Sequence, residues 1–466
     1  MRFGEAIKKI EGLRLIADNT PVLSEPGRVC LMQSPFITDT AALEKEIEFL
    51  RKTIEFLSRK ESREKVEEIR RELRKARDIS NTISRIKRGN VPDDVELFEI
   101  KGLAILCTVL RNLTACTLLS EIDAIDFPCL EKVVEILDPE HTGNTHFHIY
   151  DAYSPSLAEK RRELKALQAH SGCDEERSEK LTSECMLLED EVRAQLGTRL
   201  QPYAEALSDA LQTAGKLDCL MAKGALAVNQ GQCLPELTEE TTEYTALEYP
   251  PVKIRLEQRG ERFQPVDITL HPGVTLITGA NMGGKTITLK SVALAQALAQ
   301  FGFGVPASHA GVCPVEDIEC IFGDSQSSAE GLSSFGAEIL QIDGVLRRCA
   351  QGEKLLVLID EPARTTNPEE GRAIASAVID SLGATRSLCL LTTHYSNIPS
   401  ECRRLKVKGV KDGICRSDVT GPDALRRLMD YSLLPDSNTG VDREALRIAR
   451  LIGISRDFSE KIENRL

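Results

Sequence analysis

Residues 279–286 combine glycines, a lysine and a threonine at the spacing of a loop that binds phosphate. The segment reads GANMGGKT, follows the apolar run 274–277, and precedes a long pattern rich in alanine and leucine. A strand, a G-x-x-x-x-G-K-T segment and a helix in this order form the context that a P-loop requires. Glycines let backbone N–H groups face phosphate oxygens, and the helix N-terminus adds a favourable dipole. We therefore expect a nucleotide-binding loop in which Lys285 contacts the β- and γ-phosphates and the Thr286 hydroxyl holds Mg²⁺. The other loop residues expected to bind the nucleotide are Gly279, Ala280, Asn281, Met282, Gly283 and Gly284.

A pair of acidic residues stands at the end of another apolar run. Residues 355–359 are all aliphatic and lead directly into Asp360 and Glu361. An acidic side chain at the carboxyl end of a buried strand can hold Mg²⁺ through water, and a neighbouring carboxylate can orient and deprotonate the attacking water. We assign the metal role to Asp360 and the role of general base to Glu361. The alternative, an acidic surface turn, is disfavoured by the aliphatic run before it.

A third predicted strand, residues 388–393, is followed by His394. A single histidine after a strand is usually structural. Because this sequence also contains a phosphate loop and an acidic pair, we expect His394 to sense the γ-phosphate. Composition alone predicts a polar loop at 323–327 and a helix cap at 332–335.

The composition indicates a helix-rich protein with enough residues for two or three domains. The chain has 466 residues, a net charge of −13 and no tryptophan. No apolar run reaches the roughly 20 residues that span a bilayer, and the first residues lack the apolar core and cleavage site of a signal peptide. Fourteen cysteines occur without any C-x-x-C pair, so neither disulfides nor zinc sites are expected. We predict a cytoplasmic protein with reduced thiols and no membrane contact.

Positive charge is concentrated in residues 51–90. This segment carries 14 Lys and Arg against 7 Asp and Glu, a surplus of 7 that leaves −20 for the rest of the chain. A basic helix can contact phosphate or an acidic partner, but such a run is more often a solvated helix face with i,i+4 ion pairs. The acidic balance of the whole chain argues against a dedicated nucleic-acid binder.

The first half of the chain reads mainly as helices. Apolar residues recur every three or four positions over about 40–87 and 93–120, a charged helix is predicted over 156–196, and another helix is predicted over 198–229. The last two meet near Gly197 and form either a helical hairpin or a single bent lever. Short strands are predicted at 29–32 and 145–150. In the second of these, His146 and His148 share a face but lack a third ligand for a metal.

Beyond residue 249 predicted strands alternate with predicted helices, after a polar linker over 229–245. This alternation predicts an α/β sheet with helices on its faces. The predicted strands are 252–257, 266–270, 274–278, 312–315, 318–322, 355–360 and 388–393. The predicted helices are 285–301, 335–350, 369–382 and 423–430. Residues 441–466 read as two short helices separated by Gly453.

These segments together resemble the MutS family of ATPases. TGANMGGKT is similar to the family's phosphate loop, and GDSQSSAEGLSSF to its glutamine loop and Ser-Thr-Phe signature. LVLIDEPARTTNPEEG resembles its metal and base motif with the following dimer loop, and LLTTHYSNIP its Thr-His-aromatic switch. The order and spacing also agree. Weaker similarity to the core, the lever helices and the closing helices extends the resemblance over about residues 40–460.

The resemblance implies an α/β fold, an ABC-type P-loop ATPase domain preceded by an all-α core and lever domain. Sites of the ABC class are composite, which implies ATP, Mg²⁺ and a homo- or heterodimer through the ATPase domains. Ser333 and Ser334 would then act on the partner's nucleotide, and Gln326 would lie near Mg²⁺ and the attacking water. The adenine-stacking group is left open between Phe263 and Tyr249. The implied divisions are 1–38 without an assignment, 39–240 as core and lever, 246–440 as the ATPase domain and 441–466 as a helical dimerisation segment.

The chain also departs from the family pattern. Ala280 replaces the usual proline, and Pro362, Ala363 and Thr365 alter a loop that is usually richer in glycine. The catalytic groups remain. A mismatch-reading domain has no room before residue 40, no strands of a DNA clamp are inserted near Gly197, and no nuclease-like domain follows in this sequence.

The partner of the lever is the remaining question. MutS-like ATPases without clamp and reader resemble reactivating factors of adenosylcobalamin-dependent lysine or ornithine aminomutases, which implies ATP-driven remodelling of a protein client. The missing clamp and the acidic balance favour such a client, and we expect it. The alternative is a mismatch repair or recombination protein that binds mismatched or branched DNA, which the basic segment 51–90 favours. A scaffold that does not hydrolyse ATP is disfavoured by the intact Lys285, Asp360 and Glu361.

Overall fold

The computed structural model describes residues 1–144, 146–169, 175–279, 284–323, 334–364, 366–395, 398–411, 428–436 and 444–464. The chain divides into two compact units. We call residues 1–20, 34–48 and 226–466 the sheet unit, and residues 21–33 and 49–225 the helical unit. No helix in the described residues is long and apolar enough to cross a membrane.

The helical unit is built from helices whose apolar faces share one core. In chain order they are α3 (Glu25–Gln33), α4 (Thr40–Ser58), α5 (Arg63–Leu73), α6 (Ser80–Lys87), α7 (Asp94–Thr114), α8 (Glu131–Leu137), α9 (Pro155–Gln168), α10 (Glu175–Leu200) and α11 (Ala204–Gln230). The boundary between the two units falls within α4 and α11.

The start of α7 is determined by its local sequence. The Asp93 side chain accepts the Glu96 N–H at 2.8 Å, and the Glu96 carboxylate accepts the Asp93 N–H, which is a capping box.

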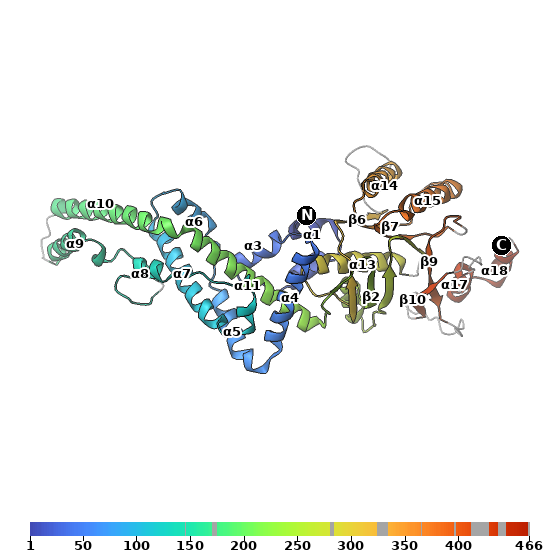
Figure 1. Cartoon of the computed structure of the whole chain (residues 1–466), viewed down its shortest axis with the longest axis horizontal. Helices are drawn as coiled ribbons and strands as arrows, with labels where there is room; N and C mark the ends of the chain where they lie inside the picture. Colours follow the sequence, from blue (N-terminus) through green and yellow to red (C-terminus); the bar gives the residue numbers. More distant parts are fainter. Residues whose placement is uncertain are drawn as a thin grey trace. The chain divides into compact units, whose positions relative to one another are not determined.

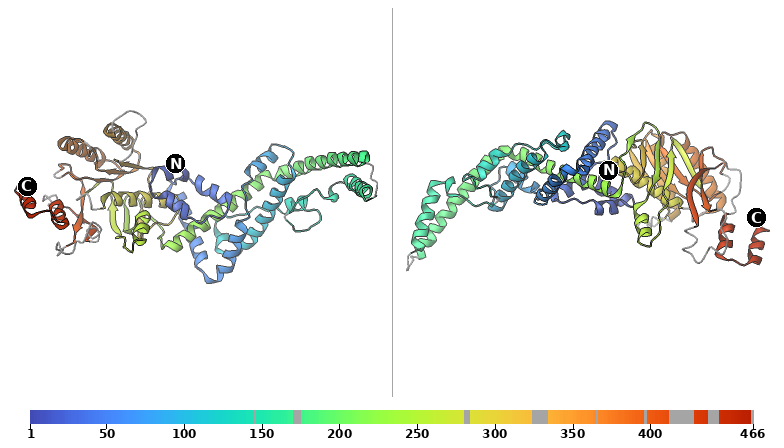
Figure 2. Two further views of the ribbon diagram at one scale, coloured as in Figure 1. Left: turned by 180° about the vertical axis from the view of Figure 1, so that it is seen from behind. Right: turned by 90° about the horizontal axis from the view of Figure 1, so that it is seen from below.

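A long helical lever runs through this unit. α10 continues into α11 through the short 3₁₀ turn Gln201–Tyr203, and α9 lies alongside α10 (Figures 1 and 2). Of the two interpretations of this region, the bent lever is therefore confirmed, and the hairpin is formed by α9 and α10 instead. The predicted junction at Gly197 is wrong, because Gly197 lies inside α10. A Cβ there would approach Pro92 Cδ to 2.7 Å, so the glycine serves close packing.

A buried ion pair lies in the core of the helical unit. Lys101 on α7 and Asp138 after α8 are 0% and 2% exposed, with Nζ and Oδ1 3.3 Å apart. Lys101 also donates to the His146 carbonyl at 3.0 Å and to the Tyr150 hydroxyl at 3.2 Å. The strand predicted over 145–150 is wrong for residues 146–150, which have no regular structure. Within this segment Tyr150 lies beside Lys101, whose Nζ is over the Tyr150 ring, 5.5 Å from the ring centroid.

The sheet unit contains a six-stranded sheet in the order β10-β9-β4-β8-β7-β6. Its strands are β4 (Gly273–Thr278), β6 (Asp317–Phe322), β7 (Leu355–Asp360), β8 (Leu388–Thr392), β9 (Arg403–Val410) and β10 (Met429–Pro435). All neighbouring pairs are parallel except β10 with β9. The aliphatic runs of β4, β7 and β8 are the pattern of parallel strands that are buried on both faces. The strands predicted at these three positions and at 318–322 are confirmed.

Helices cover this sheet as the alternation predicted. α14 (Ser334–Ala350) and α15 (Pro368–Gly383) pack on one face, where Ile342, Val345 and Val378 share a core with Leu276 and Val357. α13 (Lys285–Gln300) is buried throughout residues 292–300. The predicted helix at 423–430 lies mostly outside the described residues, and its described end, Met429–Asp430, is wrong because it belongs to β10.

A second, four-stranded sheet has the order β1-β5-β2-β3. Its strands are β1 (Glu236–Leu237), β2 (Thr242–Leu247), β3 (Val266–Leu270) and β5 (His309–Val312). The polar linker predicted over 229–245 is therefore wrong in part, because it holds β1 and most of β2. The strand predicted over 252–257 is helix α12 (Pro250–Glu257), where two prolines occupy the first positions and preset the helical φ. The strand predicted at 312–315 ends at Val312 instead.

The first residues of the chain also form helices. α1 (Phe3–Lys9) and α2 (Leu13–Asn19) belong to the sheet unit, where the Phe3 ring lies 5.1 Å from the Phe301 ring, centroid to centroid. The strand predicted at 29–32 is wrong because these residues lie in α3. At the other end, α17 (Glu444–Ile452) and α18 (Arg456–Glu463) flank Gly453, which confirms the prediction for the described C-terminal residues.

Candidate functional site

Three neighbouring strands bring the predicted chemical groups to one edge of the six-stranded sheet. β4, β8 and β7 are adjacent and parallel, so their carboxyl ends lie side by side. Gly279 follows β4, Thr392 ends β8, and Asp360 ends β7. The carboxyl edge of a parallel sheet is where α/β proteins bind ligands.

The phosphate loop connects β4 to α13. Gly279 has a φ of +126° and Gly284 a φ of +75°, values that an L-residue rarely adopts. Ala280, Asn281, Met282 and Gly283 lie outside the described residues. The Lys285 ammonium, whose side chain is 4% exposed, donates to the Gly279 carbonyl at 2.7 Å, so it reaches back across the loop.

The predicted metal ligands lie in contact. The Thr286 hydroxyl donates to Asp360 Oδ2 at 2.7 Å, and the Thr392 hydroxyl donates to Asp360 Oδ1 at 2.5 Å. A hydroxyl and a carboxylate are hard oxygen donors, and Mg²⁺ typically takes one or two protein ligands besides phosphate and water. The donor set therefore fits Mg²⁺.

Glu361 lies between the loop lysine and the strand-end histidine. Its carboxylate is 3.4 Å from Lys285 Nζ and 3.5 Å from His394 Nδ1. Its φ is +50°, a strained value for a residue with a side chain, and its N–H is held by the Thr392 hydroxyl at 3.0 Å and the Thr392 carbonyl at 3.2 Å. These bonds aim the carboxylate into the space between Lys285 and His394.

Groups behind Glu361 hold the turn that follows it. The Ala363 N–H donates to the Glu338 carboxylate at 3.1 Å, and the Tyr395 hydroxyl donates to the Ala363 carbonyl at 3.2 Å. Burial raises the pKa of Glu338 and the pKa of Tyr395. Gly371 on α15 is required here, because a Cβ at this position would lie 2.1 Å from the Tyr395 hydroxyl.

An aromatic side chain covers the start of α13. A Cβ added to Gly284 would lie 3.0 Å from Tyr431 Cδ1, so the ring packs against the loop. Tyr431 lies on β10, where Gln264 accepts the Tyr431 N–H at 3.2 Å. Tyr249, one of the two expected adenine-stacking groups, is 1% exposed and packs near Gly12, so that assignment is wrong. Phe263, which precedes Gln264, is partly exposed and stays a prediction.

The structure thus brings together Lys285, Thr286, Asp360, Glu361 and His394. Gln326, Ser333 and Thr365 lie outside the described residues, and of Ser334 only its place at the start of α14 is described. Sequence reasoning missed Thr392, Glu338 and Tyr431. For Thr392 a signal was present, since it is a polar residue at the end of an aliphatic strand run.

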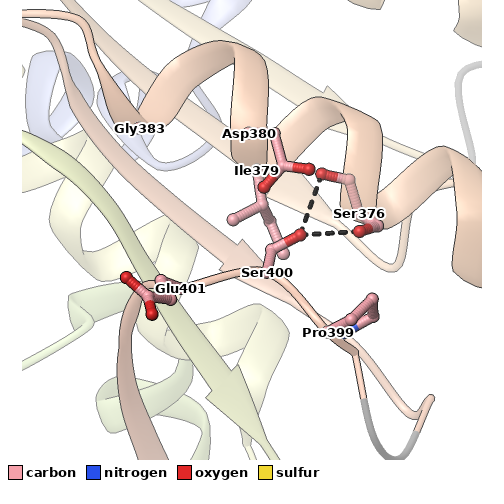
Figure 3. A pocket seen from close by; sticks show the side chains of 7 residues that line it. All are labelled: Ser376, Ile379, Asp380, Gly383, Pro399, Ser400 and Glu401. Carbon is pink, nitrogen blue, oxygen red and sulfur yellow. Dashed lines mark hydrogen bonds between the residues drawn. The ribbon is translucent and has the colours of Figure 1, made fainter.

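A shallow hollow in the sheet unit is separate from this constellation. It lies between α15 and residues 399–401, and its lining includes Asp380 and Glu401 (Figure 3). The Ser376 and Ser400 hydroxyls in it are 2.6 Å apart. None of the described phosphate-loop or strand-end groups lines it, and its two carboxylates would repel phosphate.

Comparison with known proteins agrees with this geometry. Residues 275–418 match the family model described as MutS domain V. The chain is 31% identical over 276 residues to an "Endonuclease MutS2" of Caldanaerobacter subterraneus subsp. tengcongensis, which covers 58% of this chain and 32% of that protein. It is 32% identical over 251 residues to the "DNA mismatch repair protein MutS" of Haloquadratum walsbyi (53% of this chain, 24% of that one) and 33% identical over 241 residues to that of Thermus aquaticus (52% and 27%).

The chain therefore spans about a third or less of the length of these relatives. The matched segment begins within β4 and includes the phosphate-loop, acidic and histidine motifs, the same segments that carry the resemblance seen in the sequence. On these grounds the chain belongs to the MutS family.

Proposed function

We propose that the sheet unit binds ATP and hydrolyses it. The observation that carries this proposal is the convergence of Lys285, Thr286, Asp360 and Glu361 at the carboxyl edge of one parallel sheet. This set supplies a cation for phosphate, ligands for Mg²⁺ and a carboxylate base, which are the parts that phosphoryl transfer to water needs.

Each group has a role that follows from its position. Lys285 exchanges its contacts with the Gly279 carbonyl and Glu361 for phosphate oxygens when the nucleotide binds. Glu361 then accepts a proton from the attacking water, and His394 lies close enough to contact the γ-phosphate or that water. Thr286 and Asp360 would hold Mg²⁺, which offsets the charge of the phosphates. Gln326, Ser333 and Ser334 keep the roles that the family resemblance implies, in a site completed across a dimer.

ATP turnover by the purified chain tests this proposal, with Glu361→Gln as the decisive variant. Glutamine keeps the shape of the side chain but cannot accept the proton, so we expect turnover to fall by roughly 100-fold or more while ATP stays bound. Glu401→Gln is the matched control, because Glu401 is an exposed carboxylate in the hollow of Figure 3. If the Glu361→Gln variant hydrolysed ATP at the wild-type rate, the assignment of Glu361 as the base would be wrong. If the wild-type protein did not hydrolyse ATP, alone or with DNA, the proposal of ATPase activity would be wrong.

The helical unit offers a second candidate function, binding of DNA. Arg63, Lys65, Arg74 and Arg77 on and just after α5 are exposed, and within the described residues they form no ion pair. Such cations are available to phosphate oxygens, which receive half or more of the hydrogen bonds in protein–DNA complexes. The relatives named above are a mismatch repair protein and an endonuclease. The aminomutase client expected from the sequence has no support from these relatives, so DNA is the partner we propose.

Binding to duplex, mismatched and branched DNA across salt concentrations tests this second proposal. We expect the affinity to fall with salt by a log–log slope of about −0.9 for each phosphate contact. The triple change of Arg63, Arg74 and Arg77 to alanine should weaken binding and flatten that slope, whereas Arg386→Ala, which removes an exposed arginine of the sheet unit, should leave both unchanged. Equal binding by both variants would contradict a DNA contact at α5.

A further inference from the structure

A lysine amine and a cysteine thiol lie in direct contact in the sheet unit, away from the nucleotide site. Lys354 Nζ is 2.7 Å from Cys313 Sγ. Cys313 directly follows β5 of the four-stranded sheet, and Lys354 directly precedes β7 of the six-stranded sheet. Hydrogen bonds to sulfur are ordinarily longer than those to oxygen, so this contact is unusually close.

The surroundings hold both groups in place. Lys354 Nζ and Cys313 Sγ each donate to the same acceptor, the Glu239 carbonyl, at 3.0 Å. The backbone of Cys313 is fixed on both sides, because its N–H donates to the Thr242 hydroxyl at 3.0 Å and its carbonyl accepts from the Gln296 amide at 2.9 Å. The Cys313 side chain is fully buried, Lys354 is partly exposed, and within the described residues the Lys354 amine forms no ion pair. A small oxidant can therefore reach the pair from the lysine side.

We propose that Cys313 and Lys354 form an oxidative modification site, in which one oxygen atom bridges the lysine nitrogen and the cysteine sulfur. The oxidant is dioxygen. The neutral amine and the thiol lose one hydrogen each on joining the bridge, as R–NH₂ + R′–SH + O₂ → R–NH–O–S–R′ + H₂O. One oxygen atom of dioxygen enters the bridge and the other leaves as water, with nitrogen and sulfur oxidised and dioxygen reduced. A separation of 2.7 Å is too long for a direct N–S bond, but it is a span that one bridging oxygen can close.

Other cysteines provide an internal comparison. Cys107 in the helical unit is also buried and donates to a carbonyl, that of Pro128, at 3.3 Å. No contact between Cys107 and a lysine amine is present in the described residues, and burial raises the pKa of its thiol to about 12, which keeps it protonated and unreactive. Cys107 should therefore stay a free thiol under conditions that convert Cys313.

The consequence for the fold is a covalent link between the two sheets. The bridge would join the end of β5 to the start of β7, the strand whose other end carries Asp360 and Glu361. We expect the bridged protein to unfold at a higher temperature than the reduced protein, because a link restricts the unfolded chain.

Mass spectrometry of the full chain tests the proposal. Wild-type protein kept in oxygen-saturated buffer should gain about 14 Da, one oxygen less two hydrogens, and should yield a linked peptide pair containing Cys313 and Lys354. An anaerobic sample should show neither, and dithiothreitol should restore the free amine, the free thiol and the lower unfolding temperature. Cys313→Ser and Lys354→Met should each abolish the gain, whereas Cys107→Ser should keep it.

Two outcomes would contradict the proposed bridge between Cys313 and Lys354. One is quantitative alkylation of Cys313 in denatured, oxygen-treated wild type without any linked peptide. The other is a product that lacks the bridging oxygen. This would be either a linked protein about 2 Da lighter than the reduced protein or a sulfinic acid at Cys313 with Lys354 unmodified. Both are measured on the wild-type protein, so the result does not depend on whether a variant folds.

Discussion

Thr392 is the residue that joins the two carboxylates of the candidate site. Its hydroxyl donates to Asp360 and accepts the N–H of Glu361, whose backbone is strained. The position of Asp360 and Glu361 could be predicted because acidic residues directly after a continuous aliphatic run are typical of the carboxyl end of a buried strand. The contacts of Thr392 could not be predicted, because they depend on β8 lying beside β7. A local sequence motif does not determine the order of strands in a sheet.

Replacing Thr392 with valine should test this role. Valine keeps the volume but removes both hydroxyl contacts, so we expect a loss of about 1–2 kcal/mol in the free energy of unfolding. We also expect kcat to fall roughly tenfold, which corresponds to about 1.4 kcal/mol, because Asp360 and Glu361 lose their alignment. Thr393→Val is the matched control, since Thr393 also makes one buried hydrogen bond, to the Tyr395 N–H at 3.0 Å, but contacts neither carboxylate. If the two variants lost turnover equally, Thr392 would have no special part in positioning the site.

Aromatic residues near the site show the limit of residue-by-residue prediction. The sequence left the adenine-stacking group open between Tyr249 and Phe263. The structure buries Tyr249 and instead places Tyr431 over Gly284. Tyr431 lies on β10, more than a hundred residues after the phosphate loop. No local sequence pattern could therefore predict that Tyr431 packs against Gly284.

At the scale of elements, the strength of the local pattern decided which predictions were confirmed. The runs that became β4, β7 and β8 are short, continuous and mostly aliphatic, a pattern that favours buried strands. Residues 252–257 alternate in the same way as a strand, yet the two prolines before them start a helix. Residues 146–150 alternate as well, but the buried Lys101 determines their path through its bonds to the His146 carbonyl and the Tyr150 hydroxyl. Short alternating patterns are overridden by tertiary contacts, whereas continuous apolar runs are not.

The division of the whole molecule could be predicted only in outline. An all-helical part before an α/β part follows from the change in periodicity near residue 249. The structure adds that the chain passes between the units more than once, because residues 1–20 and 34–48 belong to the sheet unit and residues 21–33 to the helical unit. The Phe3 ring contacts the rings of Phe301 and Phe303, about 300 residues later in the chain, and no local pattern encodes such contacts.

Because each unit has its own core, a substitution in the helical unit can lower stability without changing the phosphate site of the sheet unit. Asp138 in the helical unit faces Lys101 and accepts hydrogen bonds from the Thr142 hydroxyl at 2.7 Å and the Gly143 N–H at 2.8 Å. Burial alone would raise the pKa of Asp138, but the bonds from Thr142, Gly143 and Lys101 outweigh it and lower the pKa to about 2. A carboxyl whose pKa is lower in the folded state stabilises the fold above its ordinary pKa near 4, and this contribution is lost as the pH falls toward 2.

Asp138→Asn should therefore lower the free energy of unfolding by about 3–5 kcal/mol at pH 7, because it leaves the Lys101 ammonium buried without a counter-charge. Adding Lys101→Met to this variant should recover part of the loss, since the unpaired charge is then gone. The difference between wild type and Asp138→Asn should shrink when urea unfolding is repeated at pH 3, and ATP turnover per folded molecule should stay at the wild-type level. A difference that is equal at both pH values would mean that the ion pair does not carry the stability, and a loss of turnover without a loss of stability would mean that this core takes part in the ATP cycle.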